Sequence, residues 1–181
     1  MPNSYTAEAL ADYDKAYRMG KKEGQTLPVL DDILKEKNIV AAREIPLGLV
    51  QIPSEQLVGT KTAGRSTAFS KSFYPILKEN TEFAAKWMEL YKAHMNEGIR
   101  DPIKAYEFMN KFYVEEGNKR VSVLKFFDAV SIPGIVTRIV PPRSNDKETK
   151  IYYEFMDFYS LSEINYIWFT QEGSFAKLQR L

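Results

Sequence analysis

The segment from Phe112 to Phe127 constrains the fold of this chain more than any other. It predicts a short strand, a tight turn at Gly117 and then a helix. The helix begins with three polar residues, Asn118, Lys119 and Arg120. A helix N-terminus presents unpaired backbone N–H groups and about half a positive charge, to which two basic side chains add their own. We therefore predict that residues 117–120 bind an anion such as a phosphate.

The same residues also fit an ordinary strand-to-helix corner whose basic side chains are simply solvated. Glu115 and Glu116 precede the turn, and neighbouring strand residues point to opposite faces, so only one of them can face a ligand. That carboxylate would act as a catalytic base or, at Glu116, hold Mg²⁺ against phosphate oxygens. In the alternative it pairs with Lys119 or Arg120 and does no chemistry.

A second stretch with anion-binding composition covers residues 59–71. It holds several hydroxyl residues together with Lys61 and Arg65, and no acidic residue occurs over residues 59–78. Backbone N–H groups and hydroxyls in such a loop can surround an anion. The stretch equally fits a flexible surface loop. If it forms the other wall of the site, Arg65 should lie near Arg120.

Composition limits the classes of function. The 181 residues carry a net charge of +1, so nucleic acid could be bound only through a local basic patch. The chain has no cysteine, which fits a reducing compartment, and no apolar run approaches the ~18 residues of a membrane span. We expect one cytoplasmic domain with a well-packed core and no membrane partner.

Apolar spacing and end signals predict three further helices. They cover Thr6 to Arg18 (closed by Gly20), Leu30 to Leu34, and Thr81 to Gly98, whose apolar stripe includes His94, the only histidine. One histidine cannot form a His-cluster metal site, so a structural role is expected for it. The predicted strands are a hairpin of Ile103–Met109 and Phe112–Glu115 around Asn110-Lys111, a pair formed by residues 135–140 and 151–158, and Tyr166–Phe169. A short helix beginning at Gly173 suggests that the chain is part of a longer protein. The fold class is α+β, with a small mixed sheet.

Four segments resemble the N-terminal domain of the ParB/sulfiredoxin superfamily: Glu44–Val50, Gly98–Met109, Phe112–Arg120 and Val130–Ile139. Gly117 to Arg120 occupies the position of the family's Gly-x-x-Arg box, and Pro102 and Pro133 match its strand-opening prolines. The resemblance covers residues 43–140. It implies a ParB/sulfiredoxin-like domain over residues 41–181, with C-terminal strands over 151–169 and a helical N-terminal appendage over residues 1–40. We expect the appendage to pack on the domain or to form a homodimer.

The resemblance implies that the box binds the phosphates of a nucleotide, as ParB-type members do with CTP or a related ligand. Sulfinic acid repair, the chemistry of the sulfiredoxins, needs a cysteine that this chain lacks. Lys119 stands where a histidine or a second arginine is more frequent, which preserves the positive charge but not the acid–base range of histidine. The predicted function is therefore a nucleotide-binding regulatory domain that uses residues 117–120, Arg65 and Lys61.

Two other classes of function remain open at this stage. The first is a slow, Mg²⁺-dependent phosphoryl-group enzyme, an NTPase, nuclease or nucleotide-dependent kinase, in which Glu115 or Glu116 is the critical carboxylate and a nucleoside triphosphate is bound with the metal. The second is a DNA-binding adaptor. ParB proteins place a helix-turn-helix after this domain, and the strands expected over residues 151–169 leave no room for one, so sequence-specific DNA binding is not expected.

Overall fold

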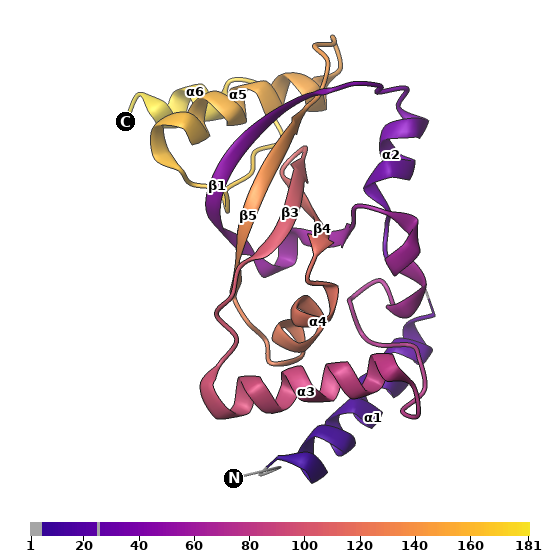
Figure 1. Cartoon of the computed structure of the whole chain (residues 1–181). Coiled ribbons are helices and arrows are strands. Elements are labelled where there is room, and N and C mark those ends of the chain that lie inside the picture. Colours follow the sequence, from indigo (N-terminus) through magenta and orange to yellow (C-terminus); the bar gives the residue numbers. More distant parts are fainter. Residues whose placement is uncertain (1–4, 25) are drawn as a thin grey trace.

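The computed structural model describes residues 5–24 and 26–181, which form a five-stranded mixed sheet with helices on both faces (Figure 1). The strands are β1 (Arg43–Pro53), β2 (Leu57–Thr60), β3 (Ile103–Phe108), β4 (Lys111–Glu116) and β5 (Ser131–Val140). Their order is β1-β5-β3-β4-β2, with antiparallel pairs β1–β5 and β3–β4 and parallel pairs β3–β5 and β2–β4. The predicted α+β class is confirmed.

The helices are α1 (Thr6–Glu23), α2 (Leu30–Glu36), α3 (Glu82–Glu97), α4 (Asn118–Phe126), α5 (Lys147–Ser162) and α6 (Ser174–Gln179), with 3-10 turns η1 (Ser54–Gln56) and η2 (Ala63–Ala68). One face of the sheet packs on α4 through Val121 and Leu124, and the other on α2 through Leu30. In Figure 1, α3 and α1 lie beyond α4, while α5 and α6 cover the opposite end of the sheet.

The predicted hairpin between β3 and β4 is confirmed, with its turn one residue earlier than expected. Met109 and Asn110 both have positive φ, 53° and 60°. Two such residues in succession define the two-residue turn whose twist matches that of the flanking strands. The backbone N–H of Asn110 also donates to the Glu107 carboxylate at 2.8 Å. This bond ties the turn to the core of the sheet.

The N-terminal helix packs on the rest of the domain, which is one of the two arrangements expected for it. Tyr13 of α1 is fully buried, and its ring centroid lies 5.3 Å from that of Trp87 in α3. The sequence predicted that Gly20 ends the helix, but α1 continues to Glu23. A Cβ at Gly20 would lie 2.4 Å from the Pro75 carbonyl oxygen, so the glycine permits close packing there.

The predicted C-terminal strands are wrong. Residues 151–158 belong to α5, in which Ile151, Tyr152, Phe155 and Phe158 are buried at helical spacing. Asp146 caps the helix by accepting from the Thr149 backbone N–H at 3.3 Å. Residues 166–169 form no strand, whereas the predicted last helix is confirmed as α6. Residues 135–140 were expected to pair with residues 151–158. They belong to β5, which already has β1 and β3 as its neighbours.

A buried ion pair joins α5 to the sheet. Arg138 of β5 donates from Nε to Glu107 of β3 at 2.8 Å, and the Tyr152 hydroxyl of α5 lies 2.7 and 2.6 Å from the two carboxylate oxygens. Burial opposes the charge on Arg138, but Glu107 outweighs it and raises the pKa of the guanidinium. Burial first and Glu107 second raise the pKa of Tyr152, so its hydroxyl remains a donor.

We expect Glu107→Gln to lower the free energy of unfolding by about 3–5 kcal/mol, because it leaves Arg138 buried without a counter-charge. Urea unfolding measures the loss. Glu116→Gln is the matched control, because it breaks the exposed Glu116–Lys104 pair and should cost less than about 1 kcal/mol. Equal effects of the two substitutions would contradict the role assigned to the buried pair.

Candidate functional site

The predicted turn and helix start at Gly117 are confirmed. Gly117 has φ 111° and ψ 25°, and a Cβ there would lie 2.8 Å from Cγ2 of Ile103, so other residues would be strained and crowded. The first helical bond runs from the Val121 N–H to the Gly117 carbonyl at 3.0 Å. The N–H groups of residues 118–120 therefore lie before the first helical bond, at the positive end of α4.

Asn118, the first residue of α4, presents a buried amide. Its side chain is only 7% exposed, and Oδ1 has no hydrogen-bond partner among the described residues. Buried polar atoms are nearly always paired, so this one has unused bonding capacity. Rotation of the amide by 180° would place Nδ2 there instead. In either orientation the amide lies beneath the surface at the start of α4.

Lys119 lies within a group of positive charges. It is half-buried, with Nζ 5.4 Å from the centroid of the Phe83 ring. Burial lowers its pKa most, the charges of Arg65 and Lys86 lower it further, and Glu82 acts in the opposite direction. Glu82 in turn lies 3.1 Å from Lys86, so its charge is shared. Three cations and one carboxylate therefore lie in this region.

The structure thus brings Arg65, in η2, close enough to Lys119 for their charges to interact. From the sequence we predicted that Arg65 lies near Arg120, the residue that follows Lys119 in the box. Within residues 5–24 and 26–181, neither Arg65, Lys119 nor Arg120 takes part in an ion pair. Two segments far apart in sequence therefore contribute cations that form no ion pair to the same region.

Arg120 has a structural role that the sequence did not reveal. Its Nη1 donates to the carbonyl oxygens of Asp101 and Pro102, at 3.2 and 3.1 Å. These residues immediately precede β3, so Arg120 connects the start of α4 to the start of that strand. Asp101 contributes its carbonyl oxygen here. Part of the donor capacity of Arg120 is therefore used within the protein.

The two predicted catalytic carboxylates are both exposed. Glu116 lies 3.4 Å from Lys104 of β3, and not in a pair with Lys119 or Arg120 as one alternative had it. Glu115 lies near Tyr106, whose pKa is raised by burial and then by this charge. In the described part of the chain no cluster of three or more His, Cys, Asp or Glu residues is arranged to hold a metal ion.

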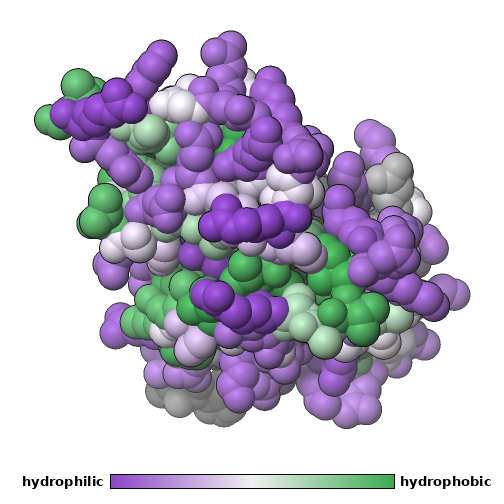
Figure 2. Space-filling model, turned by 90° about the horizontal axis from the view of Figure 1, so that it is seen from above, coloured by the Kyte–Doolittle hydropathy of each residue, from purple (hydrophilic) through white to green (hydrophobic). Residues whose placement is uncertain are grey.

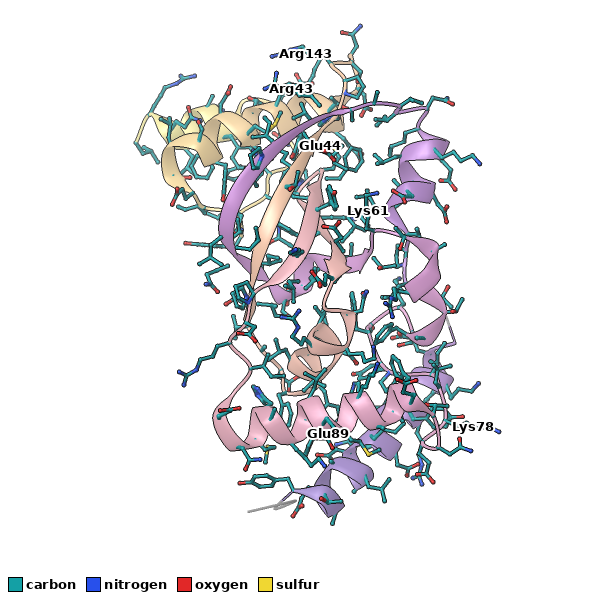
Figure 3. The ribbon with its side chains drawn as sticks, in the orientation of Figure 1. Arg43, Glu44, Lys61, Lys78, Glu89 and Arg143 are labelled. Atoms are coloured by element: carbon teal, nitrogen blue, oxygen red, sulfur yellow. The ribbon has the colours of Figure 1, made fainter. Side chains whose placement is uncertain are left out.

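Lys61 does not join the box. Its Nζ lies 2.5 Å from the Asp31 carboxylate of α2 and 5.2 Å from the centroid of the Tyr106 ring. Figure 3 shows it beside the sheet on the side of α2. The predicted loop is therefore divided, with Lys61 held by α2 and Arg65 near α4. The Asp31 partner could not be found from local sequence, because it lies 30 residues away.

His94 has the expected structural role. Its Nδ1 accepts the backbone N–H of Ile99 at 3.2 Å, and its ring packs 4.7 Å from that of Phe127. The bond replaces a helical partner at the end of α3, where the chain leaves the helix through Gly98.

A cavity lies elsewhere, at the β3–β4 turn. Its volume is about 1440 Å³, and its lining includes Asn110, Tyr113, Lys125 and Trp168 but no residue of the box. Sequence reasoning identified only the turn near Asn110 in this region. It did not predict the cavity, whose lining also comes from η1, α4 and the C-terminal segment.

Comparisons with protein-family models, with curated proteins and with solved structures give no match to this chain. None of the helices in residues 5–24 and 26–181 combines the length and the apolar character needed to cross a membrane.

We expect Arg120→Ala to lower the free energy of unfolding by about 1–2 kcal/mol without any ligand, because two carbonyl groups lose a charged donor. Chemical denaturation monitored by circular dichroism measures this. Arg100→Ala is a suitable control, because Arg100 is exposed and close in sequence to the same strand entry. An Arg120→Ala protein as stable as the control would show that the two bonds do not hold the strand entry.

Proposed function

We propose that the chain is a nucleotide-binding regulatory domain that holds phosphate groups at the N-terminus of α4. The main support is the pair of cations Lys119 and Arg65, which lie close enough for their charges to interact and form no ion pair among the described residues. Like charges held close together destabilise the fold, and the free energy is recovered when an anion binds among them. A phosphate group also accepts several hydrogen bonds, which suits the N–H groups of residues 118–120.

Each residue has a defined part in this proposal. The N–H groups of residues 118–120 donate to phosphate oxygens, and Lys119 and Arg65 approach from two sides as charged donors. Gly117 lets the backbone turn without crowding Ile103. Arg120 holds the turn against the start of β3 and adds positive charge. A triphosphate, with several negative charges in a row, can reach cations on both α4 and η2.

The order of elements supports a ParB/sulfiredoxin-like reading of the same region. A strand leads through Gly117 into a basic helix start, and Pro102 immediately precedes β3. Nucleotide binding ranks above phosphoryl transfer in this proposal because Glu116 pairs with Lys104, whereas Glu115 lies by Tyr106. A Mg²⁺ ion, if used, would accompany the nucleotide phosphates, with Glu116 the nearest carboxylate in sequence.

The proposal extends to location and partners. We place the protein in the cytoplasm, where nucleotides are abundant, with DNA as a second partner through local basic residues only. Helices α5 and α6 occupy the place of the expected C-terminal strands. They do not have the spacing of a helix-turn-helix, because α6 has only six residues and follows α5 after the long connection 163–173. A homodimer through α1 would have to use Leu10 and Met19, because the opposite face of that helix packs on α3.

Calorimetric titration with CTP, ATP, GTP and inorganic triphosphate, with and without Mg²⁺, tests the proposal. We expect binding with 1:1 stoichiometry, weakened about tenfold by Lys119→Met and by Arg65→Ala, which corresponds to about 1.4 kcal/mol for each lost charged contact. Affinity should fall as salt is raised, because the interaction is partly electrostatic.

Lys15→Met is the matched control, because Lys15 is an exposed lysine of α1. It should bind like the unmodified chain. Glu116→Gln tests the metal arm, since it should weaken binding only when Mg²⁺ is present. Binding that is lost equally in Lys15→Met and Lys119→Met, or the absence of heat with every phosphate ligand, would refute the proposed site.

A further inference from the structure

The sheet face that carries α2 is only partly covered. Helix α2 packs on it through Leu30, over Ile139 near the end of β5. Side chains alternate between the two faces along a strand, so Thr137, Ile135 and Pro133 lie on the same face as Ile139. Ile135 is 46% exposed, so no part of the described chain covers the sheet there. We name this uncovered part of β1, β5 and β3 the open face.

An apolar pair lies at the centre of the open face. Leu49 of β1 is the direct neighbour of Ile135 across the sheet and is 61% exposed. Lys104 of β3 is the neighbour of Ile135 on its other side, so one row of side chains crosses three strands. With strands about 4.8 Å apart, the row is about 10 Å wide, which is close to the diameter of a helix. A helix placed there would continue the layer that α2 begins.

Two carboxylates without ion pairs border the open face. Glu44 belongs to β1 and Glu115 to β4, and both are exposed. Neither takes part in an ion pair within the described part of the chain. Both act on Tyr106 of β3, whose pKa is raised first by burial, then by Glu115 and then by Glu44. Two negative charges from different strands therefore meet beside Tyr106.

The lysines beside these carboxylates are already paired. Lys61 lies 2.5 Å from Asp31, and Lys104 lies 3.4 Å from Glu116. Each of these cations is balanced by its own carboxylate, so the two carboxylates without ion pairs give the open face an excess of negative charge. Apolar side chains also reach the surface elsewhere, and Figure 2 shows them between hydrophilic regions on the face seen from above. The open face differs in joining an apolar pair to charges of one sign.

A hollow at the border with α2 has room for a long side chain. Its volume is about 320 Å³, and its lining includes Leu34, Ile39 and Ile139 together with Glu44 and Lys61. Figure 3 shows the two charged residues on the α2 side of the strands. Lysine and arginine combine an apolar stem with a charged head. The stem would pack on the apolar lining, and the head would reach Glu44.

We propose that the open face docks a basic amphipathic helix of a partner protein. Its apolar stripe covers Leu49 and Ile135, and its lysines or arginines approach Glu44 and Glu115. The carboxylates favour a basic partner over DNA or an acidic protein, because like charges brought together oppose binding. This surface lies on the sheet and shares no residue with the box, so the inference does not rest on the proposed function.

The probe is a synthetic helical peptide of about five turns, in which leucines form one stripe and lysines flank it. Fluorescence anisotropy with the full chain should show saturable 1:1 binding. We expect the double variant Leu49→Thr and Ile135→Thr, which keeps side chains suited to strands, to weaken binding about tenfold through lost apolar contact. The double variant Glu44→Gln and Glu115→Gln should weaken it about fivefold and reduce its dependence on salt.

Leu161→Gln and Glu97→Gln are the matched controls. Leu161 is an exposed apolar residue of α5, and Glu97 is an exposed carboxylate at the end of α3 that forms no ion pair among the described residues. Both should bind the peptide unchanged, and circular dichroism establishes that each variant is folded. A second peptide, with glutamates in place of the lysines, should not bind.

Three results would overturn the proposal: no binding of the lysine peptide, equal binding of the glutamate peptide, or equal weakening by the control variants. Sedimentation velocity tests the other occupant of the open face. The chain should remain monomeric across a range of concentrations. Self-association that is lost in Ile135→Thr would show that a second copy of the chain covers this face, and would equally overturn the proposal.

Discussion

The contact of Glu107 with Arg138 and Tyr152 is the interaction on which the rest of the structure depends. It joins β3, β5 and α5 at one buried point, and the Asn110 N–H adds the β3–β4 turn. Buried charges destabilise a fold unless they are paired and hydrogen-bonded, and here the carboxylate receives donors from three side chains or backbone groups. The rings of Tyr152, Phe155 and Tyr159 also lie within 5.9 Å of the Arg138 guanidinium. The end of the sheet is thereby fixed in one arrangement.

The position of the box follows from this arrangement. At one end of the β3–β4 hairpin, Glu107 holds the turn by accepting from the Asn110 N–H. At the other end, β4 leads through Gly117 into α4 and the box. The strand between the turn and the box is only six residues long, so the box lies close to an anchored part of the sheet. Such support is what a binding site needs to keep its donors and acceptors in place.

Local signals made much of the fold predictable. The Thr81 cap, whose Oγ1 accepts from the Ala84 N–H at 3.1 Å, and the Gly117 corner both depend on residues a few positions apart. The aromatic run of residues 151–158 was misread as a strand, although its buried positions recur at helical spacing. Gly20 was misread as a helix end. A glycine is needed there because the helix packs closely against Pro75, and such a tertiary contact is not visible in the local sequence.

The composition of the candidate site was predictable, but its partners were not. Gly117 and the basic residues after it were identified from local pattern alone. The neighbours that decide their roles come from distant segments: Arg65 beside Lys119, the carbonyl of Asp101 on Arg120, and Lys104 on Glu116. No spacing rule links such pairs, since the sheet topology brings them together.

The central functional claim is that phosphate groups bind at the start of α4, and the backbone amides there report it most directly. A ¹H–¹⁵N spectrum recorded during titration with inorganic triphosphate should show the largest shifts for the amides of Asn118, Lys119 and Arg120, with a smaller set in η2 around Arg65. Amides that shift elsewhere while those of residues 118–120 stay in place would contradict the account.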